Sequence, residues 1–571
     1  MADASSRGEA DSASGLSSHL ASGSDAASSQ GADSVPVFSL GGRGVKHLCV
    51  ELVDANVPFQ AVVVETPEDS LMWADRGLTR SEQVIGAEVL QELITDCDLT
   101  CSGAFEGVKT TAIACALISK ACERWLDAHG LPTTRAPTFQ SIWSWEKNWS
   151  CQNEILALDD SSGDQSCLFG DILLCTPDEH RKKVGLDGGV EWPASKLEKI
   201  LPYCDVKVRA KCKRHCRVCR VKKADIHFAG TSCTDHSSFG KNKKFRGPTA
   251  KLFFLWCAMR RKLREKVVIH ENVVLFGLAK LRQHLGDLYI TMADVTDPET
   301  DGYAGTRKRQ YTLLILRCLF EGHVIEDKLA DSAGSQSIIS PARVDRVVTH
   351  TMNLPTTRSK LFAAKCGHTW HAYAVGSGEE LERDLTWARQ RLSVKERWAK
   401  PTTTKYVDDG QDSWLGAFTV SERDRFDLYQ SMWPNEACDV RQNPLERPGV
   451  RSRNGKLSCL MAGMGIIFSP ELGRWLIPIE LWLTMGFPVT PAGVSRTGVV
   501  CQFSRGFPNA PRTRTRASQL KQIGNAMHVE SVGSVLLTAF LKLAPLLRTR
   551  SKNAASSGCP CGPSCSKKQK R

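Results

Sequence analysis

The sequence lacks the segments that would place it in a membrane or outside the cell. It has no run of about 18 apolar residues, so no membrane-spanning helix is expected. Its first residues carry neither a basic region nor an apolar stretch, so we expect no secretory signal and no secretion. No internal repeat is found in the 571 residues. That length is sufficient for two or three globular domains.

Without a secretory signal, a disulfide framework is not expected either. The 22 cysteines are then free thiols, metal ligands or a nucleophile. The formal net charge is +13, which favours a polyanionic partner such as nucleic acid. Solvated basic faces would give the same pattern, so the charge only supports that interpretation.

Composition separates two tails from an ordered middle. Residues 1–36 are rich in Ser, Ala, Gly and Asp and are expected to be disordered, and an N-terminal extension follows at 37–95. Residues 548–571 form a basic tail that contains cysteines. Its last lysines and arginine, at 567–571, are either a nuclear address or simply a soluble end.

Between the tails, strand-like runs alternate with helix-like runs. Strands are predicted at residues 96–100, 139–145, 167–173, 224–228, 267–273 and 310–316. Helices are predicted at 110–126 and, with an amphipathic pattern, at 529–547. The alternation predicts an α/β fold with a mostly parallel, doubly wound sheet covered on both faces. The alternation of strand-like and helix-like runs is absent at 325–455, which we interpret as a smaller inserted domain.

A cysteine follows one predicted strand in a loop of small and hydroxyl residues. Cys233 lies in this loop, at residues 229–240, where α/β enzymes commonly carry reactive groups. Glu271 lies near the end of the next predicted strand. A nucleophile and an acid at neighbouring strand ends suggest covalent catalysis on an electrophile that must be protonated. For a single cysteine, a buried structural thiol is the alternative.

Further motifs follow in a fixed order. An arginine pair precedes a strand, at Arg307 and Arg309. A helix that ends in a Gly-Phe-Pro turn contains Arg474, Glu480, Gly486, Phe487 and Pro488. A turn before the last helix contains Gln522, Gly524, Asn525 and Ala526.

In this order, from about residue 96 to 547, the chain resembles the DNA cytosine-5 methyltransferase family. The cysteine loop of the family is matched at Gly230, Cys233, Ser237 and Gly240, and its Glu-Asn-Val motif at Glu271, Asn272 and Val273. Ser232 and Thr234 replace the proline and the glutamine that flank the family's cysteine.

The resemblance implies a Rossmann-like methyltransferase sheet. The catalytic domain would occupy 96–324 and 456–547, and the insert at 325–455 would recognise the target. The implied activity is transfer of a methyl group to carbon 5 of cytosine in DNA. A structured RNA substrate and a non-catalytic nucleic-acid-binding relative are the alternatives.

The resemblance also implies catalytic roles. Cys233 would attack the cytosine ring, Glu271 would protonate it, and Asn272 would orient the loop. Arg307 and Arg309 would hold the edge of the base and the carboxylate. The N-terminus of a following helix, together with Arg309 and Lys241, should lower the pKa of Cys233. A stacked base is out of reach, so it must be flipped out.

The implied methyl donor is S-adenosylmethionine. The residues expected to contact it are Cys101, Gly103, Phe105, Glu146, Asp171, Ile172, Asn525 and Ala526. Among these, Glu146 would accept hydrogen bonds from the ribose hydroxyls, and Asp171 and Ile172 would flank the adenine. A nuclear location is expected if the basic run at 567–571 is a nuclear address, with the cytoplasm as the alternative. No membrane partner is expected, and the oligomeric state is left open, a monomer being compatible with the sequence.

Two groups of cysteine and histidine residues raise the question of a metal. The first contains Cys204, Cys212, His215, Cys216 and Cys219. It could hold zinc, but the spacing is not a standard double-knuckle pattern, and free thiols on a basic loop are the alternative. A weaker group contains Cys366, His368 and His371. From the sequence we assign no metal ligand.

Overall fold

The computed structural model describes residues 61–237, 240, 242–320, 341–396, 414–511 and 514–548. The N-terminal tail at 1–36, Lys241 and nearly all of the tail at 548–571 lie outside the described residues. The predictions that fall on these segments therefore stay predictions.

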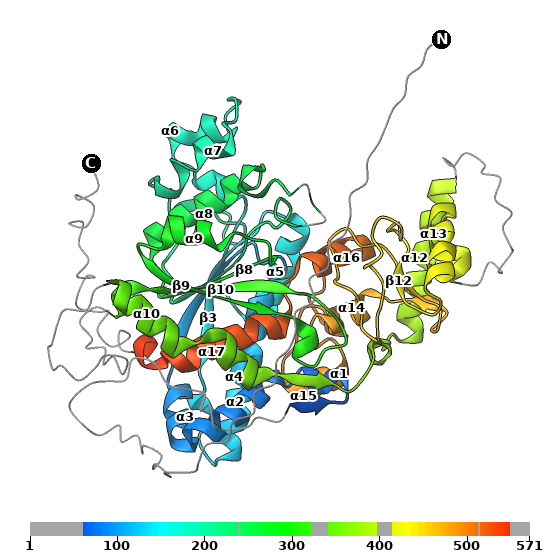
Figure 1. The fold of residues 1–571 in the computed structure, drawn as a ribbon, viewed down its shortest axis with the longest axis horizontal. Coiled ribbons are helices and arrows are strands. Elements are labelled where there is room, and N and C mark those ends of the chain that lie inside the picture. Colours follow the sequence, from blue (N-terminus) through cyan, green and yellow to red (C-terminus); the bar gives the residue numbers. More distant parts are fainter. Residues whose placement is uncertain are drawn as a thin grey trace, which may run out of the picture. The chain divides into compact units, whose positions relative to one another are not determined.

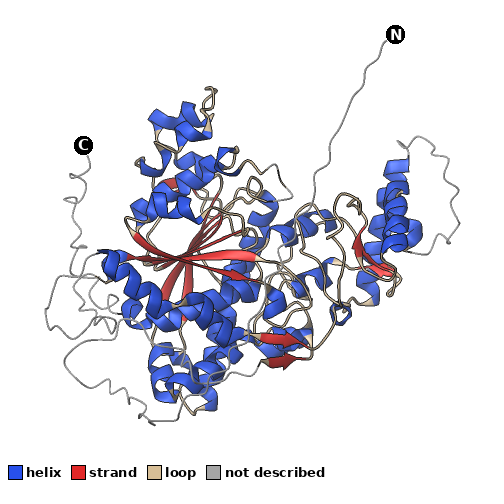
Figure 2. Cartoon of the chain, in the orientation of Figure 1, coloured by secondary structure: helices blue, strands red, loops and turns tan. Residues whose placement is uncertain are grey.

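A seven-stranded sheet forms the centre of the fold (Figure 1). Its strands are β2 (Asp98–Ala104), β3 (Thr138–Trp145), β4 (Cys167–Phe169), β7 (Ile226–Gly230), β8 (Val267–Asn272), β9 (Tyr289–Thr296) and β10 (Arg309–Leu316). They lie in the order β4-β3-β2-β7-β8-β10-β9, and in this sheet only β10 runs antiparallel to its neighbours. Figure 2 shows the sheet with helices on both faces. The predicted doubly wound α/β fold is confirmed.

The prediction differs from the structure at both edges of this sheet. At one edge, β4 ends at Phe169 instead of continuing to 173. The Asp171 carboxylate accepts a hydrogen bond from the Leu173 amide (3.0 Å) and caps a short 3-10 helix. At the other edge lies β9, which the sequence analysis does not predict, because both polar and apolar residues occupy its half-buried positions.

Helices cover both faces of the sheet. One face is covered by α4 (Thr110–Ala128), α10 (Pro341–Met352), α11 (Leu354–Phe362) and α17 (Val529–Arg548). Behind them lie α2 (Trp73–Ile85) and α3 (Ala87–Ile94). The opposite face carries α8 (Ala250–Leu263) and α9 (Leu278–Leu285) (Figure 1). The chain between β3 and α8 also contains α5 (Trp149–Ser162), α6 (Asp178–Arg181) and α7 (Ala194–Leu197).

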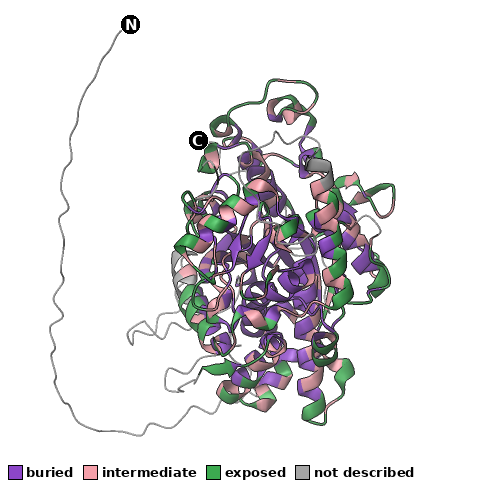
Figure 3. Cartoon of the chain, turned by 90° about the vertical axis from the view of Figure 1, so that its right-hand side faces the viewer, coloured by how far each residue is buried: buried purple, intermediate pink, exposed green. Residues whose placement is uncertain are grey.

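The last helix is buried on all sides, although an amphipathic pattern implies one exposed face. Every α17 residue from 529 to 544 is buried, and Figure 3 shows the buried interior to which the helix belongs. A Cβ added at Gly533 would come within 2.2 Å of Trp73, so glycine permits α2 and α17 to approach closely. In the described part of the chain, Arg516–Arg548 is long and apolar enough to cross a membrane. Because 94% of its apolar window is buried in the fold, it is a core helix here.

The described part of the predicted N-terminal extension belongs to the main fold. Besides α2 and α3 it contains α1 (Pro67–Ser70) and β1 (Val62–Val64), which pairs in parallel with β11 (Ala364–Cys366). The Arg80 guanidinium on α2 donates hydrogen bonds to the carbonyls of Leu361 (3.0 Å) and Ala363 (2.9 Å).

A second, smaller hydrophobic core lies within the second half of the chain. It is built by α12 (Gly378–Glu396), α13 (Val420–Met432) and a sheet of β12 (Cys438–Asp439), β13 (Ile467–Ser469) and β14 (Arg474–Trp475). The buried Trp475 indole donates to Asp384 (2.6 Å) and joins β14 to α12.

The limits of this core differ from the predicted insert at 325–455. Its buried residues run from Leu385 to Ile477, whereas α10 and α11 pack on the main core through residues such as Met352 and Phe362. The chain then returns to α17 through α14 (Pro478–Thr484), α15 (Pro491–Thr497) and α16 (Arg516–Asn525).

Candidate active site

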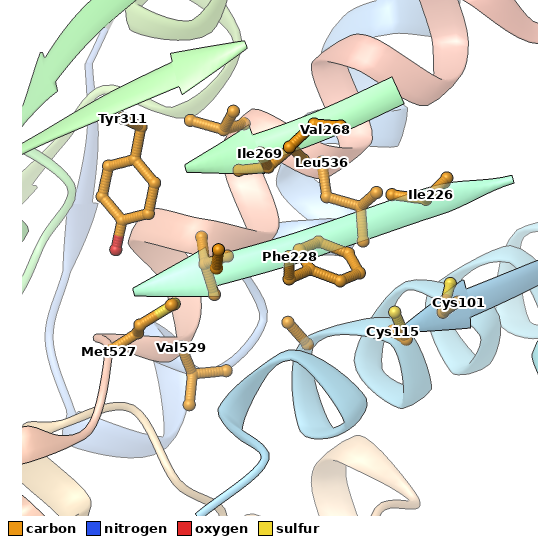
Figure 4. Packing of buried hydrophobic residues seen from close by; sticks show 14 of the residues in the cluster. Cys101, Cys115, Ile226, Phe228, Val268, Ile269, Tyr311, Met527, Val529 and Leu536 are labelled. Carbon is orange, nitrogen blue, oxygen red and sulfur yellow. The ribbon is translucent and has the colours of Figure 1, made fainter. Parts of the chain in front are cut away.

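The carboxyl ends of β2, β7 and β8 meet at one edge of the sheet. β7 and β8 are parallel neighbours, and Gly230 pairs with Glu271 at their ends. A Cβ added at Gly230 would lie 2.9 Å from Met527 Cε, 3.0 Å from the Phe105 carbonyl oxygen and 3.3 Å from Glu271 Oε2. Figure 4 shows Met527 beside the end of β7. Because Gly230 has no side chain, four segments that are distant in sequence meet there.

Hydrogen bonds from β8 fix the start of the cysteine loop. Asn272 Nδ2 donates to the Thr231 carbonyl (2.9 Å) and to its hydroxyl oxygen (3.1 Å). The Thr231 hydroxyl also lies 2.7 Å from His270 Nε2. Burial lowers the pKa of His270 to about 3, so its ring is neutral and can accept this hydrogen bond. Asn272 and His270 therefore position the segment that leads to Cys233.

Cys233 is exposed, and its thiol does not have the lowered pKa that the sequence analysis expects. Desolvation by the surrounding chain is the largest cause that raises the pKa of Cys233, and the Glu271 carboxylate raises it further. Arg309 and Arg307 partly offset both effects. No helix begins directly after this cysteine, since α8 starts at Ala250. The Cys233 carbonyl instead accepts hydrogen bonds from the two turn amides at 236 and 237.

Glu271 and Arg309 form an ion pair beside this loop. Arg309 Nε lies 3.1 Å from Glu271 Oε1, and both side chains are mostly buried. The same guanidinium donates to the Lys308 carbonyl (2.8 Å) and lies 3.8 Å from Cys459 Sγ. Arg309 therefore orients the carboxylate that faces Gly230.

The chain itself engages the Arg307 guanidinium in this structure, whereas the sequence analysis expects it to hold the edge of a base or the carboxylate. It is buried, and its guanidinium donates to three backbone carbonyls: Leu460 (2.6 Å), Gly524 (3.1 Å) and Ala526 (2.6 Å). A guanidinium carries five donors in a rigid fork, which suits such a clamp. Arg307 joins the loop between β12 and β13 to the turn before α17.

β2 continues past its predicted end at residue 100, so Cys101 and Gly103 lie within the strand instead of in the loop that follows it, which we call the donor loop. Cys101 is buried and its thiol contacts Cys115 (Figure 4). A Cβ on Gly103 would collide with the Glu106 carboxylate. Both residues line a crevice of about 530 Å³ between β2, β3, α4 and α5. The loop itself starts at Phe105, where the backbone takes a positive φ of 59°.

Glu146 follows the last residue of β3, as expected. Burial raises its pKa to about 7, although the backbone amides of Asn148, Gly107 and Lys147 partly offset this. The amide of Asn148 donates to its carboxylate at 2.7 Å. Glu146 therefore lies against the donor loop.

Asp171 and Ile172 follow β4 at the adjacent strand end. The Asp171 carboxylate pairs with Lys147 (2.7 Å), and the Ile172 side chain is buried.

The turn at Asn525 and Ala526 lies over the donor loop. A Cβ on Gly107 would lie 3.5 Å from the Asn525 carbonyl oxygen and 4.0 Å from the Ala526 amide nitrogen. One residue earlier, a Cβ on Gly524 would come within 2.0 Å of the Ala462 amide nitrogen, so only glycine fits. The structure thus brings the last predicted motif to the edge of the sheet where the cysteine loop lies.

Several residues at this edge are missed by the sequence analysis. Thr231, Met527 and Cys459 contact predicted site residues, but nothing in their local sequence marks them. Gly107 could have been found, because a glycine after a strand and before a helix often has a positive φ, here 64°.

The weaker predicted metal group is not brought together in the described structure. Cys366 Sγ donates to the His368 carbonyl (3.1 Å), whereas His371 pairs with Glu471 (2.7 Å). Its members have separate partners and do not form a ligand set among the described residues.

Comparison with known proteins gives one family match. A family model described as C-5 cytosine-specific DNA methylase matches residues 207–539, more than half of the chain. No curated protein matches this chain. Similar solved structures include a putative DNA modification methyltransferase encoded within a prophage of E. coli. It has 12% identity and a TM-score of 0.39, over 78% of this chain and 99% of that one.

Two further structures have similar scores. The Entamoeba histolytica methyltransferase EhMeth has 11% identity and a TM-score of 0.34, over 78% of this chain and 98% of that one. The S. pombe Dnmt2 methyltransferase has 12% identity and a TM-score of 0.34 over the same shares. From the family match, the chain belongs to the C-5 cytosine-specific DNA methylase family, whose members transfer a methyl group from S-adenosylmethionine to cytosine.

Proposed function

We propose that this protein methylates carbon 5 of cytosine in DNA, with Cys233 as the nucleophile. The observation that carries the proposal is the convergence at Gly230, where Phe105, Glu271 and Met527 all lie within contact distance. A thiol loop, a carboxylate and the donor loop thereby share one edge of the sheet. The formal net charge of +13 supports a polyanionic substrate.

The residues at the neighbouring strand ends fit S-adenosylmethionine. Phe105 and Gly107 have positive φ in the loop after β2. Glu146 offers a buried carboxylate after β3, and Asp171 lies after β4, where α/β folds bind ribose and adenine. Asn525 closes the loop from the other side. When bound, S-adenosylmethionine supplies an electrophilic methyl group on its sulfonium.

The chain's own residues then act on a cytosine turned out of its stack. The Cys233 thiolate forms a bond to carbon 6, and ring electrons shift toward nitrogen 3, where Glu271 supplies a proton or hydrogen bond. Carbon 5 then uses the electron pair of the resulting enamine to take the methyl group, and the bond between that methyl group and the donor sulfur would break to leave a neutral thioether. A base removes the proton from carbon 5, nitrogen 3 gives back its proton, and the bond between carbon 6 and the Cys233 sulfur breaks, which returns the thiolate. Asn272 holds the loop and Arg309 holds the carboxylate throughout.

The two residues that differ from the family's cysteine loop are compatible with this chemistry. The Ser232 hydroxyl donates to the Thr234 hydroxyl oxygen at 3.2 Å, across Cys233. This hydrogen bond restrains a loop that lacks the family's rigid proline. It supports an active enzyme over a non-catalytic binding relative.

Target recognition is proposed for the smaller core and the loop within it that connects β12 to β13. That loop reaches the catalytic edge directly, because Cys459 contacts Arg309 and Leu460 accepts a hydrogen bond from Arg307. A DNA sequence read there can therefore affect the position of the catalytic arginine.

Methyl transfer to matched DNA and RNA duplexes tests the proposal. The purified full chain should transfer label from S-adenosylmethionine to DNA and should form a covalent complex with DNA that contains 5-fluorocytosine. Fluorine at carbon 5 cannot leave as a proton, so the bond to Cys233 persists. Cys233→Ala should lose both signals, whereas Cys216→Ala, at another exposed cysteine, should keep them.

Each other result rejects a specific part of the proposal. Label in RNA alone would replace DNA by a structured RNA as substrate. Tight binding without transfer would make the protein a non-catalytic relative. Full activity of Cys233→Ala would remove this cysteine from the mechanism. A nuclear location, which DNA as substrate implies, is tested by imaging the fluorescently tagged chain.

A further inference from the structure

Four metal-binding side chains meet at the β4 edge of the sheet, away from the cysteine loop. They are Cys167, Cys212, His215 and Cys219, and their sulfur and nitrogen atoms all lie within 4.8 Å of one another. Cys167 is the first residue of β4. The other three come from a hairpin of β5 (Arg209–Lys211) and β6 (Val218–Arg220).

The distances agree with those around a tetrahedral ion. His215 Nδ1 lies 3.5 Å from Cys167 Sγ, 3.4 Å from Cys212 Sγ and 3.5 Å from Cys219 Sγ. A tetrahedral zinc ion with sulfur at about 2.3 Å and nitrogen at about 2.0 Å separates these atoms by roughly 3.5 Å. One nitrogen equidistant from three sulfurs is therefore the arrangement that such an ion requires.

Hydrogen bonds hold the ligands in place. The His215 amide donates to Cys212 Sγ (3.5 Å), an outer contact that stabilises a thiolate ligand. The Cys212 amide donates to the Arg217 carbonyl (2.8 Å), and the Lys213 amide to the Leu168 carbonyl on β4 (2.7 Å). The first of these two backbone bonds closes the hairpin, and the second ties the hairpin to β4.

The charges around the group also suit a zinc ion. Three thiolates and one Zn²⁺ carry a net charge of −1, and the hairpin that surrounds them contains Lys211, Lys213, Arg217 and Arg220.

We propose that Cys167, Cys212, His215 and Cys219 bind one zinc ion in a closed structural site. Four protein ligands leave no open position, so the ion holds structure and takes no part in catalysis. It fastens the β5–β6 hairpin to β4, the strand that ends just before Asp171. The site does not depend on the proposed methyl transfer.

Two cysteines of the sequence-based group are excluded. Cys216 is exposed, and its sulfur donates to the Lys213 carbonyl (3.6 Å) instead of facing the group. Cys204 lies outside the cluster as well. Their place is taken by Cys167, which lies 48 positions before His215 and which the local spacing could not reveal.

Metal analysis of the full chain, purified without chelators, tests the proposal. The wild-type protein should carry about one zinc per chain. The zinc content of Cys167→Ser and of Cys219→Ser should in each case be at least about tenfold lower than that of the wild type. Cys216→Ser, a matched cysteine in the same hairpin, should keep it. A wild-type protein that holds no zinc even after dialysis against zinc would overturn the proposal, as would equal loss in Cys216→Ser.

A second measurement does not depend on variants that fold poorly. Wild-type protein loaded with Co²⁺ should show thiolate-to-cobalt charge-transfer absorption and the visible bands of tetrahedral cobalt. His215→Cys should retain the metal and strengthen the charge-transfer absorption, because a fourth sulfur replaces the nitrogen. A six-coordinate, sulfur-free cobalt spectrum in the wild type would reject the site.

Discussion

We predict that donor binding depends on pH through Glu146. Burial raises the pKa of Glu146 to about 7 in the free protein. Its carboxylate is proposed to accept hydrogen bonds from two ribose hydroxyls, which the ionised form does best. Binding should therefore favour the ionised form, lower the pKa of Glu146 in the complex, and release a proton near pH 7.

The magnitude follows from the ionised fraction. With a pKa of about 7, roughly a tenth of the carboxyl groups are ionised at pH 6 and roughly nine tenths at pH 8. The affinity for S-adenosylhomocysteine, a stable probe of the donor site, should then rise up to about tenfold between these values. A tenfold change in affinity corresponds to about 1.4 kcal/mol of binding free energy.

Calorimetric titration at pH 6, 7 and 8, in buffers of different ionisation enthalpy, measures both the affinity and the proton count. Glu146→Gln should bind with little dependence on pH. The control is Glu106→Gln, because the pKa of Glu106 is also raised to about 7 by burial and, less strongly, by the charge of Glu146. A wild-type affinity that is equal at pH 6 and 8, or a pH dependence that disappears only in Glu106→Gln, would refute the reasoning.

Three further predictions concern the site and the core. Gly524→Ala places a Cβ within 2.0 Å of the backbone, so the free energy of unfolding measured in urea should fall by about 1–3 kcal/mol. Gly463→Ala, which has open space around it, should leave this free energy unchanged. Equal urea midpoints for the two variants would contradict this prediction. Trp73→Ala removes a fully buried indole and should cost about 3–5 kcal/mol in the same assay. Because the pKa of Cys233 is raised, the single-turnover rate should increase up to about tenfold per pH unit from pH 7; a flat profile would contradict thiolate attack.

The sequence predicted those parts of the site that local pattern determines. Six of the seven strands of the sheet could be found because a buried strand has the pattern of a short apolar run. Glu271 and Asn272 could be placed for the same reason, since their strand and its end are visible in the sequence. The predicted lowering of the pKa of Cys233 was wrong, because it assumed a helix directly after the loop.

Contacts between distant segments could not be predicted in this way. Arg307 has the sequence position of a substrate-binding residue, but the loops at 457–462 and 524–526 fold against it and engage its guanidinium. Cys101 looks like part of a loop, but β2 continues through it into the core.

By itself, the sequence determined the α/β class, the order of the motifs and the thiol at Cys233, because these depend on residue type and short-range spacing. Only the tertiary structure decided that Arg307 clamps backbone, that α17 is covered on every side, and that Cys167 joins the cysteines of a distant hairpin. The physical reason is that these properties depend on which surfaces meet when the chain packs, and many sequences with the same local pattern can pack differently.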